Sequence, residues 1–360
     1  MRNGGEVVKR LIREAVERMA AYTPGEQPSD RGIVKLNTNE NPYPPSPMVM
    51  EALQRIDASA LRLYSDPYGT ALRDRVADLC GCRREQVFVG NGSDEVLALC
   101  TRAFVEDGGS IGYFDPSYSL YPVLADIRGA RREPLPLGPD FGWPGGAASA
   151  SPLFFMTNPN APTGVQYPTE AVARFCDAAP GVVLIDEAYV DFADADCLHL
   201  ALGRPNVLVA RTLSKSYALA GLRVGYAVGS EALIGALCKV KDSYNVGVVP
   251  QRLALAALSD PDWMRRHAGM IRATRERLQD ALRALGYVVT PSQTNFVWAR
   301  PPRWSARDVF DRLRQRGILV RYFAGDRTGA HIRITIGTDE QTDRLIAALG
   351  EIEGEGGRQP

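Results

Sequence analysis

The sequence predicts an α/β fold in which a large domain with a mostly parallel sheet carries a small α+β domain. Between about residues 70 and 260, short strand-like runs alternate with helical patterns, which is typical of a parallel sheet covered by helices on both faces. After residue 262, a long charged helix pattern leads into an α+β arrangement. A chain of 360 residues also exceeds what one hydrophobic core usually serves, which favours two domains.

The N-terminal segment is predicted to be an arm with one helix. Residues 6–21 space their apolar side chains at helical intervals, and Pro24, Gly25 and Pro28 end the pattern. The proline-rich stretch 42–47 is predicted to be a stiff crossing between domains. The resulting divisions are 1–45 (arm and part of the small domain), 46–262 (large domain) and 263–360 (small domain).

Strand and helix patterns then follow in order along the chain. The runs expected to form the large sheet are 87–91, 110–114, 153–157, 182–186, 207–211 and 224–229. In the C-terminal part, the patterns predict a helix over about 262–285, strand segments within 288–300, 317–323 and 331–337, a helix near 305–316 and a last helix. The polar tail 353–360 is expected to be disordered.

Charge and cysteine content narrow the class of protein. The 42 basic and 42 acidic side chains cancel, so no charge excess points to nucleic acid or a membrane as a partner. No apolar run approaches the length of a membrane span, and the N-terminus lacks a secretory pattern. The six cysteines are scattered and suggest no metal site, so we expect reduced thiols in a cytoplasmic protein.

Polar residues follow the predicted strands, at the edge where an open α/β sheet collects its ligands. Ser93 and Asp94 open an apolar helix, so their amides are placed to bind an anion such as a phosphate. Ordinary N-capping by Ser93 is the alternative explanation. Asp186 ends a strand and Tyr189 follows it; the carboxylate suits a cationic ring nitrogen, with capping of the next turn as the open alternative.

Lys215 follows another predicted strand, in an apolar context that is poor for a solvated lysine. Lysine forms Schiff bases with carbonyl cofactors, and its pKa falls readily when the amine is desolvated. A lysine on a loop is the alternative explanation. Ser214 and Arg223 would add hydroxyl and guanidinium donors to the phosphate that Ser93 and Asp94 approach. Together these residues predict a site for a phosphate-bearing carbonyl cofactor.

Longer motifs contain these residues, namely NPNAPTG (158–164), DEAY (186–189) and TLSKSYALAGLRVGY (212–226). Their order and spacing resemble those of the fold type I aminotransferases that use pyridoxal 5'-phosphate (PLP). Further stretches are similar to the histidinol-phosphate aminotransferase family over nearly the whole chain: VKLNTNENPYPPSP (34–47), LYSDPYGTALRDRVA (63–77), VGNGSDE (89–95), DPSYSLY (115–121), DSYNV (242–246), VRYF (320–323) and HIRITIGT (331–338). The resemblance implies a seven-stranded sheet in the large domain and a homodimer with shared active sites.

Site roles carry over from this resemblance position by position. Lys215 would hold PLP as a Schiff base and shuttle the substrate proton, Asp186 would pair with the pyridine nitrogen, and Tyr189 would bond the ring oxygen O3′. The other implied cofactor contacts are Tyr118, stacked on the ring, the phosphate ligands Ser93, Asp94, Ser214 and Arg223, and Tyr64, which reaches the phosphate from the other subunit. The implied substrate-binding positions are Tyr22, Asn39, Tyr244, Arg321 and Arg333.

One position departs from the family pattern. Families of this kind usually read NPxNPTG, whose last asparagine also bonds O3′, whereas this chain has Ala161 there. Asn158 and Asn160 are close in sequence, but a shift of one residue along an extended segment points a side chain the other way. We therefore expect that contact to be missing and Tyr189 to hold O3′ alone.

The resemblance implies that the amino group passes between L-histidinol phosphate and 2-oxoglutarate, as a step of histidine biosynthesis. Two other activities of the same fold stay open, an aromatic amino-acid aminotransferase and a decarboxylase acting on threonine phosphate. A PLP-sensing regulator would need a fused DNA-binding domain, and only about 30 residues precede the first motif. We therefore expect an enzyme with small-molecule substrates.

Overall fold

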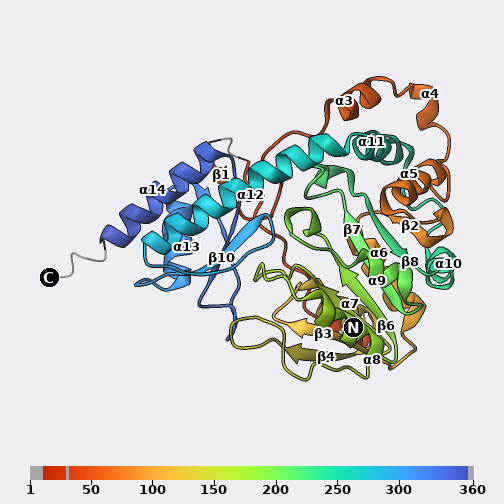
Figure 1. The fold of residues 1–360 in the computed structure, drawn as a ribbon, viewed down its shortest axis with the longest axis horizontal. Coiled ribbons are helices and arrows are strands. Elements are labelled where there is room, and N and C mark those ends of the chain that lie inside the picture. The colour runs from red at the N-terminus through yellow and green to blue at the C-terminus, as the bar shows by residue number, and fades with distance from the viewer. Residues whose placement is uncertain (1–10, 30–31, 356–360) are drawn as a thin grey trace, which may run out of the picture.

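Seven strands form the large sheet, in the order β2-β8-β7-β6-β5-β3-β4 (Figure 1). The computed structural model describes residues 11–29 and 32–355. The strands are β2 (Val87–Gly90), β3 (Ser110–Asp115), β4 (Arg131–Pro136), β5 (Leu153–Thr157), β6 (Val182–Asp186), β7 (Val207–Thr212) and β8 (Gly225–Gly229). Neighbouring strands run parallel except where β8 meets β2 and β7. The predicted α/β fold with a mostly parallel sheet is confirmed.

Strand β4 has no counterpart among the predicted runs. Its sequence, RREPLP, is polar and contains two prolines, so it lacks the apolar pattern of a buried strand. It lies at the edge of the sheet, with β3 as its one neighbour among the described strands. An edge strand tolerates proline because one side of its backbone needs no partner in the ladder.

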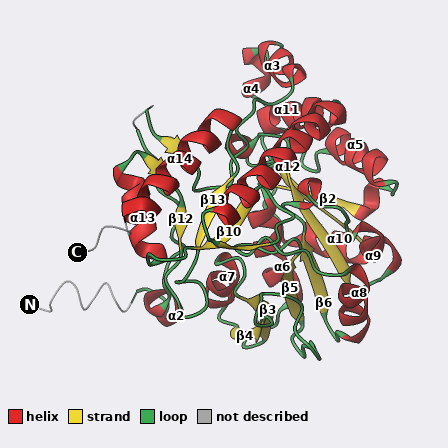
Figure 2. Cartoon of the chain, turned by 60° about the vertical axis from the view of Figure 1, so that its left-hand side comes forward, coloured by secondary structure: helices red, strands yellow, loops and turns green. Residues whose placement is uncertain are grey.

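Helices cover both faces of the large sheet, as Figure 2 shows. Along β5, Leu153 and Phe155 pack with side chains of α6 (Ser93–Phe104), α7 (Leu120–Arg128) and α10 (Glu231–Val240). Phe154 and Met156 point to the other face and pack with α8 (Thr169–Ala178) and α9 (Leu198–Gly203). Each large apolar side chain buried in this way contributes about 1.5–3 kcal/mol. The two packed faces hold the strand ends, and the polar residues after them, in fixed positions.

A third group of helices packs against the β2 end of the sheet. It contains α3 (Pro47–Gln54), α5 (Thr70–Cys80) and α11 (Val248–Leu258), and α11 packs on both α3 and α5. The short α4 (Ala58–Leu61), which follows α3 in the chain, buries none of its residues. The short 3₁₀ segments are η1 (Arg84–Gln86), η2 (Val190–Phe192) and η3 (Ala220–Leu222). Within the described ranges, no helix is both long and apolar enough to cross a membrane.

The C-terminal part forms a second, antiparallel sheet in the order β12-β13-β10-β9. Its strands are β9 (Val288–Thr290), β10 (Phe296–Arg300), β12 (Arg321–Tyr322) and β13 (Ile332–Thr335), and its helices are α12 (Pro261–Ala284), α13 (Ala306–Gln315) and α14 (Asp339–Glu355). Strand β1 (Val34–Lys35), from the N-terminal region, pairs in parallel with β11 (Ile318–Leu319). The segment at β1 thus joins the C-terminal part, whereas α2 contacts α7 beside the large sheet. Helix α12 leads from the large sheet into the C-terminal part (Figure 1).

Three sequence predictions need correction. Residues 6–10 of the predicted helix lie outside the described residues, and the described part contains only the short α2 (Glu14–Arg18), which buries none of its residues. The run 317–323 is divided between β11 and β12 because its two halves pair with different strands. Helix α14 continues to Glu355, into the tail expected to be disordered, where Arg312 and Arg316 pair with that carboxylate. Residues 356–360 lie outside the described residues.

Candidate active site

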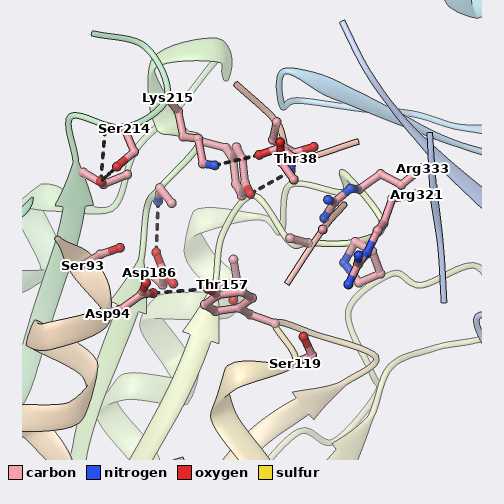
Figure 3. Close-up of a pocket in the computed structure, with 18 of the residues that line it drawn as sticks. Thr38, Ser93, Asp94, Ser119, Thr157, Asp186, Ser214, Lys215, Arg321 and Arg333 are labelled. Atoms are coloured by element: carbon pink, nitrogen blue, oxygen red, sulfur yellow. Dashed lines mark hydrogen bonds between the residues drawn. The ribbon is translucent and has the colours of Figure 1, made fainter. Parts of the chain in front are cut away.

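One cavity, with an empty volume of about 900 Å³ including its mouth, lies at the carboxyl ends of β5, β6 and β7 and faces the second sheet (Figure 3). All of the predicted site residues line it except Tyr64 and Tyr244. The lining residues among them are Tyr22, Asn39, Ser93, Asp94, Tyr118, Asp186, Tyr189, Ser214, Lys215, Arg223, Arg321 and Arg333. The fold therefore gathers in one place residues that are hundreds of positions apart.

Lys215 lies just after β7, and its side chain points into the cavity. Its Nζ donates a hydrogen bond to the carbonyl oxygen of Thr38, at 3.2 Å. Burial, assisted by the nearby charge of Arg333, lowers the pKa of Lys215 to about 8. A substantial fraction of the amine is then neutral near physiological pH, as attack on a carbonyl requires.

Asp186 is the last residue of β6 and is buried. Tyr121 Oη donates to its Oδ2 at 3.0 Å, and the backbone N–H of Ala188 donates to its Oδ1 at 3.1 Å. Burial raises the pKa of Asp186 to about 6, while both hydrogen bonds oppose that rise. The group is a held carboxylate near neutral pH, suited to a cationic partner such as a protonated ring nitrogen.

Donors for an anion converge beside this carboxylate. Helix α6 begins at Ser93 after Gly92, and no side chain caps it, so the amides of its first turn face the cavity end. Arg223 Nη1 donates to Ser214 Oγ at 3.2 Å, and Arg223 Nη2 pairs with Asp94 Oδ2 at 3.1 Å. Gly92 has φ +80°, and a Cβ there would come within 2.6 Å of Arg223 Nη2. The cradle needs glycine at that position.

Aromatic side chains border the same space. Tyr118 Oη donates to Asp94 Oδ1 at 3.2 Å, and the Tyr22 ring lies edge-on to the Tyr118 ring, with 6.1 Å between centroids. Tyr189 Oη accepts a hydrogen bond from Asn39 Nδ2 at 2.9 Å. Burial raises the pKa of both Tyr118 and Tyr189, so both phenols stay protonated and able to donate. The donor set fits a planar cofactor that carries a phosphate, a ring nitrogen and a ring oxygen.

A second group of cations lies across the cavity, on the C-terminal sheet. Arg333 Nη2 donates to the carbonyl of Asn37 at 3.0 Å, and its buried Nε has no hydrogen-bond partner among the described residues. Arg321 donates to the carbonyls of Thr23 and Pro24, at 2.7 and 3.0 Å. Within residues 11–29 and 32–355, neither guanidinium pairs with a carboxylate. Two unpaired cations facing one cavity form a receptor for an anion.

Two predicted residues lie elsewhere on the surface. The rings of Tyr64 and Tyr244 stack on each other, with centroids 4.3 Å apart and an interplanar angle of 12°. Their exposed fractions are 82% and 45%. Neither ring lines the cavity of its own chain. Contact of these rings with a cofactor site would therefore require a second subunit.

The structure around Ala161 is consistent with the expected loss of the asparagine contact to the ring oxygen. Ala161 itself lines the cavity. Asn158 Oδ1 accepts from the backbone N–H of Tyr167 at 2.8 Å, and its Nδ2 lies 3.6 Å from the Cys197 sulfur. Asn160 Nδ2 donates to the Pro116 carbonyl at 3.1 Å. Both amides are engaged away from the cavity, so neither takes the place of the absent side chain.

Sequence reasoning missed two residues that contact the predicted ones. Tyr121 holds the Asp186 carboxylate, and Thr38 supplies the carbonyl that accepts from Lys215. Tyr121 stands three residues after Tyr118 in DPSYSLY and lies in the first turn of α7, whereas Tyr118 precedes that helix, so helical spacing carries no signal for it. The contribution of Thr38 comes from its backbone, so its residue type carries no signal.

Comparison with known proteins supports the chemistry that this geometry suggests. Residues 31–349 match the family Aminotransferase class I and II. A histidinol-phosphate aminotransferase of Microcystis aeruginosa is 43% identical over 343 residues, covering 95% of this chain and 98% of its own. The chain belongs to the histidinol-phosphate aminotransferase family. A further family member, histidinol-phosphate aminotransferase 1 of Bradyrhizobium diazoefficiens, is 45% identical over 356 residues and covers 96% of this chain and 100% of its own.

A solved structure supports the cofactor of this aminotransferase. The histidinol-phosphate aminotransferase of Sinorhizobium meliloti, crystallised in complex with pyridoxal-5'-phosphate, superposes with a TM-score of 0.82 at 28% identity, covering 89% of this chain and 91% of its own. The enzyme is a PLP-dependent transaminase with the fold type I architecture. The cradle of Ser214, Arg223 and the α6 amides fits the PLP phosphate, and Asp186 fits its ring nitrogen.

Proposed function

We propose that the enzyme exchanges the amino group between L-histidinol phosphate and 2-oxoglutarate. One observation carries this proposal: the cavity has two separate anion receptors, and Lys215 lies between them in Figure 3. The cradle at Ser214 and Arg223 suits the cofactor phosphate. The second receptor, Arg321 with Arg333, suits the phosphate of the amino donor and, in the return half-reaction, a carboxylate of the keto acid.

Each site residue then has a chemical task. PLP, when bound, supplies a ring that takes up the electron pair released at the substrate Cα. Lys215 holds the cofactor through Nζ and, once displaced by the substrate amine, acts as the base that removes the Cα proton. Asp186 keeps a positive charge on the ring nitrogen, Tyr189 donates to the ring oxygen, and Tyr118 lies against the ring. Tyr22 closes the substrate end.

We also propose a homodimer in the cytoplasm, with Tyr64 completing the partner's cofactor site and Tyr244 beside it. Its support is the high exposure of Tyr64 and a group of exposed apolar side chains on α3, α4 and the segment that follows. The members of that group are Met48, Met50, Leu53, Leu61, Leu63 and Tyr68. All six cysteines are free, which suits a reducing compartment.

The division at residues 45 and 262 also remains a proposal. Its support is that α12 begins at Pro261, between the two sheets in sequence, and that β1 pairs with β11. On this division, the β1 segment and the C-terminal sheet belong to the small domain.

Single-turnover absorbance spectra test the substrate. The PLP form is mixed separately with L-histidinol phosphate, phenylalanine and threonine phosphate, and the loss of the cofactor absorbance band is timed. We expect the fastest loss with L-histidinol phosphate, because only this donor combines an imidazole ring with an anion for Arg321 and Arg333. Fast loss with phenylalanine alone, or carbon dioxide release from threonine phosphate, would overturn the proposal in favour of the two related activities.

A further inference from the structure

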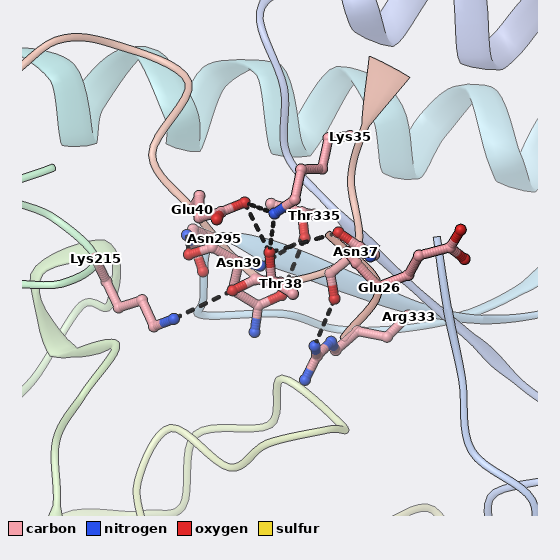
Figure 4. A network of polar contacts seen from close by, with 10 residues as sticks. All are labelled: Glu26, Lys35, Asn37, Thr38, Asn39, Glu40, Lys215, Asn295, Arg333 and Thr335. Carbon is pink, nitrogen blue, oxygen red and sulfur yellow. Dashed lines mark hydrogen bonds and ion pairs between the residues drawn. The ribbon is translucent and has the colours of Figure 1, made fainter. Parts of the chain in front are cut away.

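Asn39 is buried and bonds both to Tyr189, which follows β6, and to residues of the C-terminal part. Figure 4 shows it beside Thr335 and Asn295 of the C-terminal part. Its backbone N–H donates to Thr335 Oγ1 at 3.0 Å, and its carbonyl accepts from Asn295 Nδ2 at 2.9 Å. Its side chain accepts from Thr335 Oγ1 at 3.0 Å through Oδ1 and donates to Tyr189 Oη at 2.9 Å through Nδ2. The residue has φ +57°, a left-handed conformation that a non-glycine residue keeps only when its surroundings enforce it.

The direction of these hydrogen bonds follows from Thr335. Because Thr335 Oγ1 already accepts from the Asn39 backbone N–H, its own proton is free to go to an acceptor. That acceptor is Asn39 Oδ1, so the Asn39 amide must turn its Nδ2 toward Tyr189. Tyr189 Oη therefore receives a hydrogen bond from the protein side. Its own proton is left to point into the cavity, since Asn39 is its one hydrogen-bond partner among the described residues.

We propose that Asn39 is a positioning residue that makes Tyr189 the sole protein donor to the PLP ring oxygen, in place of the asparagine that Ala161 lacks. This inference rests on the proposed placement of the cofactor. With Ala161 unable to donate, the whole donation falls on one phenol, and its proton must be aimed. Asn39 aims it by occupying the lone pair of Oη on the opposite side, and donation into that lone pair also strengthens the outgoing hydrogen bond.

This role differs from the substrate contact expected of Asn39. The backbone N–H and Oδ1 of Asn39 bond to Thr335, and its backbone carbonyl bonds to Asn295. The remaining polar group, Nδ2, bonds to Tyr189, so Asn39 has no free group for a substrate. Thr335 and Arg333 are two residues apart on β13 and so point to the same side of that strand. Strand β13 therefore carries Arg333 of the substrate receptor and also Thr335, which orients the Tyr189 hydrogen bond through Asn39.

The pH titration of the holoenzyme absorbance band reports the inference, because a hydrogen bond to the ring oxygen favours loss of the proton at the Lys215 linkage. In Asn39→Gly, which tolerates the positive φ and keeps both backbone bonds, the pKa of that linkage should rise by roughly half to one pH unit. Adding Ala161→Asn to Asn39→Gly supplies a second donor and should bring the pKa back toward that of the unmodified enzyme.

Two controls separate positioning from a loosened structure. In a Tyr189→Phe background, Asn39→Gly should add no further change in the pKa, since no phenol remains to be aimed. Thr335→Val, which removes the hydroxyl that orients the amide, should raise the pKa in the same direction and replaces Asn39→Gly if that variant fails to fold.

The inference is overturned if Asn39→Gly titrates within about 0.2 pH unit of the unmodified enzyme, or if its change persists in the Tyr189→Phe background. The Lys215→Ala variant distinguishes a wrong positioning role for Asn39 from a wrong placement of the cofactor. If the titrating band survives in Lys215→Ala, the cofactor placement itself is wrong; if the band is lost there while Asn39→Gly is silent, only the positioning role is wrong.

Discussion

Replacing Lys215 with methionine should stabilise the cofactor-free protein, and the gain should depend on pH. The amine is partly buried, and burial together with Arg333 lowers the pKa of Lys215 from 10.5 to about 8. Between those values the folded protein binds fewer protons than the unfolded chain, so stability rises with pH across that window. Below pH 8 the folded state carries the full penalty of a desolvated ammonium.

The magnitude follows from the same two values. Removing the amine should add about 3 kcal/mol to the free energy of unfolding at pH 7, about 2 kcal/mol at pH 9 and almost nothing above pH 11. Loss of the Nζ hydrogen bond to Thr38 subtracts about 1 kcal/mol at every pH at which it forms. The net gain near neutral pH is therefore about 2 kcal/mol, and its decline with rising pH identifies its origin.

Urea unfolding of the cofactor-free unmodified protein and Lys215→Met at pH 7, 9 and 10 measures the difference. Lys239, exposed on α10, provides the matched control, and the pH dependence of Lys215→Met is compared with that of Lys239→Met. A gain that does not change with pH, or a loss of stability comparable to that of a truncated core residue, would refute the reasoning. Either result would mean that the folded state does not penalise the charge of this amine.

Three further outcomes follow from the geometry. Arg333→Gln should lower kcat/KM for the phosphorylated donor by about 10²- to 10³-fold, mainly through KM, because a partly buried charge pair is lost; equal losses with unphosphorylated donors would contradict this. Gly92→Ala should weaken PLP affinity about tenfold in equilibrium dialysis, because the added Cβ meets Arg223 and the φ of +80° disfavours alanine; unchanged affinity would show that the cradle adapts. Mixing inactive Lys215→Ala and Tyr64→Ala chains should restore activity, because mixed dimers contain one intact site if Tyr64 serves its partner; no recovery would place Tyr64 outside the partner's site.

Most of the cofactor side of the site could be predicted from local sequence. Asp186 and Lys215 each follow a strand that the residue pattern identifies, and parallel strands bring their carboxyl ends to one edge. Ser93 opens α6 directly after β2, which is neighbour to β8 in the same sheet. The edge strand β4 was not predicted, because a strand at the edge of a sheet can pair without an apolar residue pattern.

The opposite wall of the cavity depends on contacts that no local pattern encodes. Arg321 and Arg333 could be proposed as anion readers only through family resemblance, since nothing nearby in sequence distinguishes them from other surface arginines. Among the described residues neither has a carboxylate partner, and the structure places Arg333 beside Asn37, which is 296 residues away. The Asn39 junction likewise joins residues separated by 150 and 296 positions.

The sequence by itself determined the sheet, the order of polar residues along its edge and the presence of a lysine suited to a carbonyl cofactor. The strands show a local residue pattern, and the polar residues and the lysine come directly after strand ends. All of these can therefore be read from residues close together in the sequence. Only the tertiary structure decided that Arg333 lines the cavity with no carboxylate partner among the described residues, that Asn39 aims Tyr189, and that Tyr64 lies outside the cavity of its own chain. Burial and hydrogen-bond direction set those properties, and both arise only when distant segments of the chain come into contact.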